Sequence, residues 1–170
     1  MNKKSLNPSL ITKALMGLLV LAPAARLAAQ SSYATPYTFT LLAGAGGAGT
    51  VDGTGSAAKF NQPFGIAVDS SGNLYVSDKN DQTIRKVTSG GVVTTLAGMS
   101  GDIGTTNDTG SNARFNVPLG IAVGSGGDLY VADSNNDTIR KVTSGGVVSV
   151  FAGVTGTTGA LDGASGIGVF

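Results

Sequence analysis

Apolar and polar positions follow one pattern along this chain, and the chain uses that pattern twice. Short runs rich in Val, Ile and Leu are separated by clusters of Gly, Ser, Asn and Asp. The stretch 60–98 recurs as 115–153, a period of 55 residues without a gap, and 27 of the 39 aligned positions are identical. Self-similarity at such a period is typical of stacked repeat architectures, so each stretch is predicted to be one structural unit.

Each unit is predicted to contain four strands. In the first unit these are 65–68, 74–78, 83–87 and 92–96, with turn residues between them at 69–73 and 89–91. The first strand is apolar on both faces, as expected of a strand that is covered on both sides. The third does not alternate cleanly, which favours a β-bulge. Four short strands joined by tight turns predict an all-β fold class, with β-propeller blades of four antiparallel strands.

The rest of the chain is arranged around these units. A polar lead at 30–37 precedes 38–44, which resembles the end of each unit and is predicted to be the last strand of a blade. Connectors follow at 45–59, where 56–60 has room for one helical turn, and at 99–114. The stretch 154–170 begins a further connector and blade, because Phe170 lies 55 residues after Phe115. We therefore expect a fragment with two full blades, 60–98 and 115–153, of an incomplete propeller.

Residues 1–29 are predicted to be a signal peptide. Lys3, Lys4 and Lys13 precede an apolar run at 14–25, and small residues lead up to Ala29. The run is shorter than the roughly 20 residues of a spanning helix. We expect cleavage after Ala29, a secreted or periplasmic protein, and no membrane attachment after cleavage; an uncleaved anchor is the alternative.

Composition excludes several kinds of site. The chain has no Cys, no His and no Glu, so this segment contains no disulfide framework, no thiolate metal site and no histidine general base. Removing residues 1–29 takes four of the 11 basic residues, which leaves seven against 10 acidic ones and a net charge of −3. The small positive charge of the whole chain is therefore no argument for a nucleic-acid partner, and none is expected.

Several segments resemble the NHL repeat. They are Gly-Ile-Ala-Val at 65–68, Leu-Tyr-Val-Ser-Asp at 74–78 and Thr-Ile-Arg-Lys-Val at 83–87, and the second unit repeats them with Asp133, Asn135 and 138–142. The connector ending in Asp-Gly-x-Gly and then Lys/Arg-Phe-Asn-x-Pro resembles a secreted bacterial branch of that family. The resemblance covers 38–170. It implies a β-propeller, commonly of six blades with one repeat per blade, of which this chain has two.

Two local motifs resemble ligand sites. The glycines of 44–49 match G-x-G-x-x-G, but the Gly-rich residues that follow are not expected to start the helix that a dinucleotide needs. The stretch 133–137 has oxygen ligands at alternate positions, as at the start of a calcium loop, but Thr138 follows and no Glu completes it. Asp78 and Asp133 are instead expected to accept hydrogen bonds from backbone amides of the turn. We predict no cofactor and no metal.

The residues that recur in both units are predicted to be structural. Arg85 and Arg140 are expected to form ion pairs with Asp78 and Asp133; an anionic ligand is the alternative. The other recurring positions are predicted to pack between blades (Tyr75 and Tyr130) or to place a solvated charge beside a buried anchor (Lys59 and Arg114, before Phe60 and Phe115).

No catalytic residue is predicted, because a residue repeated in every blade is more easily explained by architecture than by an asymmetric active site. The connectors vary most, so we expect a non-catalytic extracytoplasmic scaffold whose rim binds a protein, peptide or glycan. The alternative is part of a six-bladed propeller enzyme, lactonase-like or lyase-like, with a metal in the central channel. Open blade edges also predict self-association.

Overall fold

The computed structural model describes residues 38–44, 46–159, 163 and 168. The chain divides into two units, Met1–Thr40 and Leu41–Phe170, and every strand of the described residues lies in the second. The predicted signal peptide 1–29 and lead 30–37 lie outside the described residues, as does most of 160–170. Among the helices of the described residues, none is both long and apolar enough to cross a membrane.

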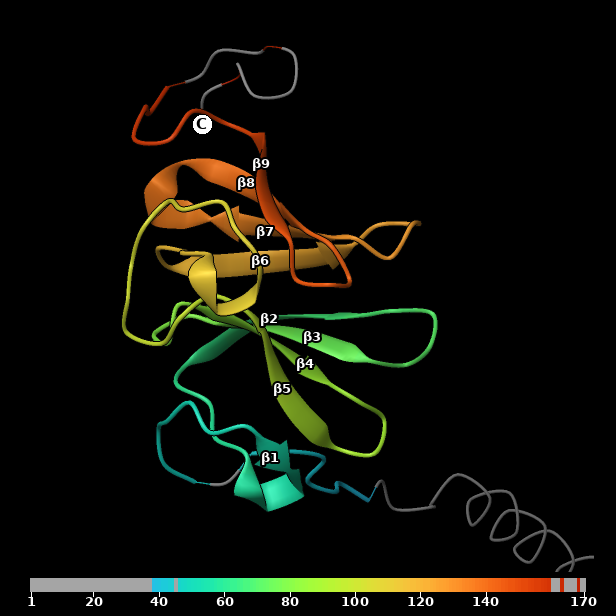
Figure 1. Cartoon of the computed structure of the whole chain (residues 1–170). Coiled ribbons are helices and arrows are strands. Elements are labelled where there is room, and N and C mark those ends of the chain that lie inside the picture. The colour runs from blue at the N-terminus through green and yellow to red at the C-terminus, as the bar shows by residue number, and fades with distance from the viewer. Residues whose placement is uncertain (1–37, 45, 160–162, 164–167, 169–170) are drawn as a thin grey trace, which may run out of the picture. The chain divides into compact units, whose positions relative to one another are not determined.

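The first unit of the sequence folds into one antiparallel sheet with the strand order β1-β5-β4-β3-β2 (Figure 1). Its four main strands follow one another as a meander, and the connector adds a short fifth strand beside the last. The bounds are β1 Gly53–Thr54, β2 Pro63–Val68, β3 Leu74–Asp78, β4 Thr83–Val87 and β5 Val92–Ala97, with a 3₁₀ helix, η1, at Gly55–Ala57.

The second unit repeats this arrangement as a sheet with the order β6-β7-β8-β9. A single bridge between Thr109 and Val147 takes the place that the β1–β5 pairing has in the first sheet. The bounds are β6 Pro118–Val123, β7 Leu129–Asp133, β8 Thr138–Val142 and β9 Val148–Ala152, with 3₁₀ helices η2 at Gly110–Asn112 and η3 at Ser134–Asn136.

The all-β fold class and the four-stranded blades are confirmed. The predicted strands 74–78 and 83–87 have the observed bounds, whereas the first strand begins earlier, at Pro63. The irregular third strand does carry a bulge, because its register with β5 shifts between Ile84 and Arg85. The possible helical turn at 56–60 is a three-residue 3₁₀ helix that begins one residue earlier.

The segment 38–44 does not form the predicted strand: none of its residues is paired in a sheet. Its last residue nevertheless contacts the first blade's connector in the way that the residue after β5 contacts the second blade's connector. Gly44 N–H donates to the Gly55 carbonyl at 3.0 Å, as Gly98 N–H donates to the Gly110 carbonyl at 3.1 Å. A strand also needs a hydrogen-bonded neighbour. β5 has β4 beside it, whereas no described residue pairs with 38–43, so this backbone stays irregular.

The main core lies between the two sheets, which Figure 1 shows stacked face to face. Each sheet has a front face, toward its preceding connector, and a rear face. The rear face of the first sheet (Tyr75, Ile84 and Ala97) packs in one buried cluster with the front face of the second (Leu129, Val131 and Val142). Ala113 of the second connector and Phe115, the first residue of the second blade, join that cluster.

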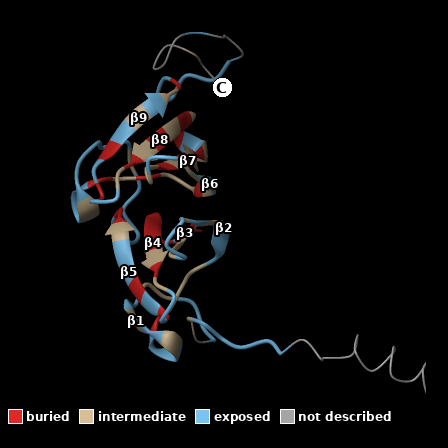
Figure 2. Cartoon of the chain, turned by 90° about the vertical axis from the view of Figure 1, so that its right-hand side faces the viewer, coloured by how far each residue is buried: buried red, intermediate tan, exposed pale blue. Residues whose placement is uncertain are grey.

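The front face of the first sheet is only partly covered. Ala58, Val76, Val87 and Val93 form a smaller buried cluster, yet Phe64, Ile66 and Val68 of β2 are 60–65% exposed. Figure 2 shows this contrast between β2 and the buried β4. The prediction of a first strand covered on both faces is therefore wrong for β2, because no sheet of the described residues lies over its outer side.

Candidate functional site

The sequence places one buried acid and one buried arginine on the front face of each sheet. Asp78 ends β3 and Arg85 lies in β4, where the antiparallel register sets Arg85 opposite Val76 and Asp78 opposite Thr83. Both side chains are fully buried, and Arg85 Nη1 lies 3.2 Å from Asp78 Oδ2. In the second sheet Arg140 Nη1 lies 2.8 Å from Asp133 Oδ2. The predicted ion pairs are confirmed.

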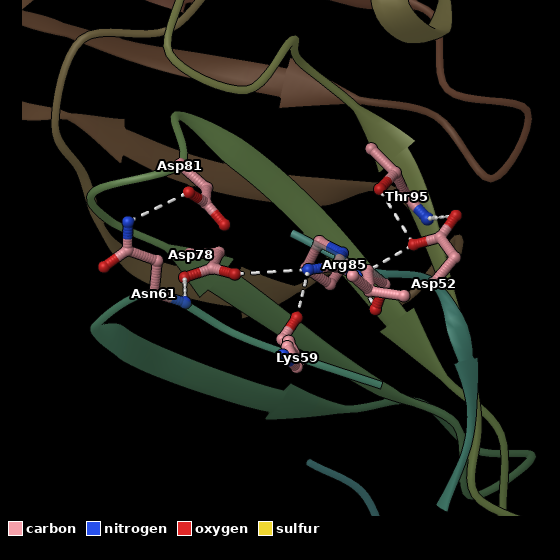
Figure 3. A network of polar contacts seen from close by, with 8 residues as sticks. Asp52, Lys59, Asn61, Asp78, Asp81, Arg85 and Thr95 are labelled. Atoms are coloured by element: carbon pink, nitrogen blue, oxygen red, sulfur yellow. Dashed lines mark hydrogen bonds and ion pairs between the residues drawn. The ribbon is translucent and has the colours of Figure 1, made fainter. Parts of the chain in front are cut away.

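Arg85 binds its sheet to the preceding connector through several hydrogen bonds (Figure 3). Arg85 donates to the carbonyls of Lys59, at 3.0 Å, and Val51, at 3.2 Å, and to Asp52 Oδ1 at 2.7 Å. Its guanidinium also lies over the Phe60 ring, 5.1 Å from the centroid, a cation–π geometry. A planar group with five donors suits this role, because one side chain satisfies several oxygens of a loop at once.

The second oxygen of each aspartate binds a backbone amide, but not one of the turn that was predicted. Asp78 Oδ1 accepts from Asn61 N–H at 2.8 Å, and Asp133 Oδ1 accepts from Asn116 N–H at 2.7 Å. Both amides belong to the segment just before the first strand, 17 residues away in sequence. The expected partner was wrong because the strand end reaches across the sheet edge rather than back into its own turn.

The two repeats differ at two positions of this network. Asp52 in the first connector corresponds to Asn107 in the second, whose Oδ1 accepts from Arg140 at 2.7 Å. Asp81 after β3 corresponds to Asn136 after β7. Asn136 Nδ2 donates to Asp133 Oδ2 and to the Gly104 carbonyl, both at 2.7 Å. The first repeat thus has carboxylates where the second has amides.

Burial dominates the electrostatics of these aspartates. It raises the pKa of Asp78 to about 6, and the negative charge of Asp81 adds to the shift, while the Asn61 N–H and Arg85 oppose it. Burial also raises the pKa of Asp133, against hydrogen bonds from Asn116, Asn136 and Arg140. Burial would raise the pKa of Asp52 as well, but hydrogen bonds from Thr95 and Arg85 outweigh it and lower that pKa.

Asp81 carries an unsatisfied oxygen in this network. Its Oδ1 accepts from Asn61 Nδ2 at 3.1 Å, but its buried Oδ2 has no hydrogen-bond partner among the described residues. Asn136 fills the equivalent place with a donor rather than an acceptor. The first network therefore holds excess buried negative charge.

The chemistry of this network is structural. Arg85 and Arg140 are at most 1% exposed and donate to oxygens of their own chain, so neither presents its guanidinium to a dissolved anion. The sequence missed Asn61 and Asn116, although both recur directly after the Phe anchor. Asp52 and Asn107 gave no such signal, because their residue types differ and they lie in the variable connectors.

The two ligand-like motifs are also part of the framework. The glycine segment 44–49 is followed by the two-residue strand β1 and the three-residue helix η1, so the helix N-terminus of a dinucleotide site is not formed there. In 133–137, Asp133 bonds inside the network and Asp137 caps η3 in the left-handed conformation, with φ of 54°. Nowhere in the described part of the chain do three metal-ligating side chains gather around one point.

The remaining predicted residues behave differently in the two sheets. Tyr75 is 4% exposed in the core between the sheets, as predicted, and its hydroxyl donates to Asp69 Oδ2. Tyr130 is half-buried and meets the Phe151 ring edge-on at 4.8 Å. Of the two charges before the anchors, Arg114 is not freely solvated, because it pairs with Asp102 at 2.7 Å. Phe115 is fully buried and Phe60 only half-buried.

The second connector is exposed yet held in place. Residues 105–109 are all exposed. Backbone bonds close the loop from Gly104 N–H to the Phe115 carbonyl and from Arg114 N–H to the Thr106 carbonyl, both 3.1 Å. The Arg114–Asp102 ion pair adds a third link. An ordered, exposed loop on a rigid sheet is the usual location of a binding surface.

The duplicated blade identifies the family. The NHL repeat matches residues 60–87 and 115–142, from the Phe anchor through the third strand of each sheet. The chain contains two NHL repeats. Each match ends at the last residue of the strand that carries the buried arginine, so the NHL repeat contains the whole Asp–Arg pair but not the fourth strand.

Animal and plant proteins are similar in sequence to the NHL part of the chain. NHL repeat-containing protein 2 of Homo sapiens is 39% identical over 95 residues, which is 54% of this chain and 13% of that protein. Protein SUPPRESSOR OF QUENCHING 1, chloroplastic, of Arabidopsis thaliana is 34% identical over 97 residues, 55% of this chain and 9% of that protein. The NHL chain thus spans a small part of the length of these relatives.

Solved structures share the NHL fold. A protein of unknown function from Bacteroides thetaiotaomicron superposes with a TM-score of 0.63 at 24% identity, over 80% of this chain and 33% of that one. An auxiliary nutrient binding protein from the same organism superposes with a TM-score of 0.53 at 26% identity, over 66% of this chain and 28% of that one.

Proposed function

We propose that this NHL chain is a non-catalytic, extracytoplasmic binding scaffold that takes up a protein, peptide or glycan on its connectors. One observation carries the proposal: the buried aspartates and arginines that recur in both blades are held in internal contacts. Asp78, Arg85 and their counterparts bind connector backbone and each other. What is left for recognition is the part that differs between the blades, above all the exposed 99–114 connector.

The similar auxiliary nutrient binding protein supports a binding role, since it shares the fold at 26% identity. The connector itself has suitable chemistry. Ile103 is 60% exposed and sits among the polar side chains Asp102, Thr105 and Thr106. An apolar contact surrounded by hydrogen-bonding groups suits a peptide or a sugar face.

The function is tested by presenting the purified full chain to a glycan array and to a displayed peptide library. We expect at least one class of ligand to bind. The Ile103→Asp variant should lose that binding at least tenfold, whereas Val92→Asp, an equally polar change on an exposed strand position, should keep it. Failure of both libraries, or equal loss in the two variants, would contradict the proposal.

The extracytoplasmic location has its own test, which rests on residues 1–29. Expression of the full chain in a bacterial host should release a product that begins at Gln30, as read by mass spectrometry of the periplasmic and medium fractions. Retention of an intact Met1 chain in the cytoplasm would contradict it. A Leu18→Arg variant, which interrupts the apolar run, should block processing and serves as the control.

A further inference from the structure

An apolar pocket lies on the front face of the first sheet. It has a volume of about 340 Å³ and is lined by Leu42, Phe60, Phe64, Ile66, Val76 and Val87, among others. Phe64 and Ile66 are more than 60% exposed. Exposed apolar surface of this kind marks an interaction site in a soluble protein.

The same face of the second sheet shows what covers such a pocket. Its equivalent residues Phe115, Leu129, Val131 and Val142 are all 0% exposed, because the rear face of the first sheet lies on them. Two polar contacts accompany this packing. Ser77 Oγ–H donates to the Leu119 carbonyl, and Val117 N–H donates to Gln82 Oε1 at 2.7 Å. The occupant of a front face is therefore the rear face of a neighbouring blade.

The chain carries a second rear face of the same composition. Tyr130, Ile139 and Ala152 of the second sheet correspond to Tyr75, Ile84 and Ala97 of the first. Tyr130, Ile139 and Ala152 of the second sheet are half-buried, whereas their counterparts in the first sheet are at most 4% exposed. Among the described residues, one front face and one rear face are thus left uncovered, and the equivalent faces already pack as a pair inside the chain.

The polar contacts are conserved in part between the two rear faces. Asp137 stands at the position of Gln82, and both have a left-handed backbone, with φ of 54° and 60°. In an equivalent contact its carboxylate would accept from the backbone N–H of Gln62, the counterpart of Val117. Gln62 and Val117 also share a positive φ. Ala132 stands in place of Ser77, so one side-chain hydrogen bond is lost.

We propose that a second copy of this chain docks head to tail, with the rear face of its second sheet on the front face of the first sheet. The contact is heterologous: each copy uses one face of each kind, so copies add in one direction until a ring closes. In a similar solved chain, the part that matches 80% of this chain makes up 33% of the length, so three such stretches fill that chain. We therefore expect the ring to close at three copies.

The mass of the full chain in solution, measured by light scattering, is the first test. We expect three times the chain mass of 16.8 kDa, or three times the mass of the processed form. Ile66→Asp places a charge on the open front face and should give monomers. Ile103→Asp makes the same change at a position of similar exposure on the connector and should leave the mass unchanged. A monomeric parent chain, or an Ile66→Asp variant with the parent mass, would overturn the proposal.

Mixing variants tests the direction of the contact. Ile139→Asp should disable the rear face, and Ala152→Asp, at the end of β9, does the same if the first variant fails to fold. Each rear variant alone should be monomeric. Mixed with Ile66→Asp, either should give a one-to-one heterodimer and nothing larger, because one intact front and one intact rear face remain. No heterodimer would overturn head-to-tail docking, and open-ended polymers of the parent chain would overturn the closed ring.

Discussion

At the scale of single residues, each blade buries one arginine and stabilises it with oxygens from its own chain. The two repeats do this with different partners. Arg85 has two carboxylates, Asp78 and Asp52, whereas Arg140 has Asp133 and the neutral amide of Asn107. Removing one partner of a buried pair is costly mainly because the remaining charge is left uncompensated.

This difference predicts unequal effects of the same substitution. Asp133→Ala leaves Arg140 without a carboxylate among its described partners, so we expect a loss of about 3–5 kcal/mol in the free energy of unfolding. Asp78→Ala leaves Arg85 with Asp52, so the expected loss is smaller, about 1–3 kcal/mol. Urea unfolding of both variants measures the two values. Equal losses, or a larger one for Asp78→Ala, would show that Asp52 does not compensate Arg85.

Asp81 and Asn136 give a second contrast at this scale. The burial and neighbouring charge that raise the pKa of Asp78 to about 6 make the folded state hold its proton more tightly than the unfolded chain, where an Asp has a pKa near 3.9. This contribution to stability is fully present below about pH 3.9 and is lost as the pH rises through about 6. At neutral pH Asp78 therefore contributes less to stability than it does in mild acid.

Exchanging the residue types of Asp81 and Asn136 tests this pH dependence. Asp81→Asn supplies the donor that Asn136 supplies in the second blade, so we expect about 1–3 kcal/mol of added stability at pH 8 and less at pH 4. Asn136→Asp should do the reverse, lowering stability at pH 8 and raising the pKa of Asp133 further. Urea unfolding of both variants at the two pH values is the measurement. A gain from Asp81→Asn that does not depend on pH would count against the shared burial of two carboxylates.

The sequence predicts part of this network and not the rest. The Asp–Arg pairs were predictable because both residue types recur at a fixed spacing. The connector side chains that also bind each arginine, Asp52 and Asn107, were not predictable. Asp52 lies 33 residues from Arg85, and its counterpart is a different residue type. Such contacts depend on where a connector folds back, which no local pattern specifies.

At the scale of elements, local patterns were sufficient wherever a strand had neighbours on both sides. The strands β3, β4, β7 and β8 follow the apolar pattern directly. The predictions failed at the two places where a neighbour is missing among the described residues. The segment 38–44 has no strand beside it, and β2 has no sheet over its outer side.

A Gly→Ala substitution tests the contact between β5 and the turn before β9 of the next blade. Gly146, before β9, has a φ of 80°, and a methyl group there would lie 2.5 Å from the Leu96 carbonyl oxygen. Gly127 has a φ of 83° but open space around the same position. Both Gly→Ala changes introduce left-handed strain of about 1–2 kcal/mol. Gly146→Ala should lower the melting temperature clearly more than Gly127→Ala, and equal shifts would mean that the two blades do not approach there.

At the scale of the whole molecule, the account rests on one geometric claim: the rear face of the first blade packs on the front face of the second. Ile84 and Val131 lie in that shared cluster. Their counterparts Ile139 and Val76 lie on the two outer faces, outside it. The four positions thus form a matched set: within one chain, the same two residue types share a buried cluster in one pair and lie on separate faces in the other.

The most direct test of this claim is a double-mutant cycle on the free energy of unfolding, with Ile84→Val and Val131→Ala in the monomeric Ile66→Asp background. Residues that share a packed contact do not contribute additively, so we expect a coupling energy of at least about 0.5 kcal/mol. The cycle of Ile139→Val with Val76→Ala in the same background should be additive within about 0.5 kcal/mol. An additive Ile84–Val131 cycle would contradict the packing of the two blades.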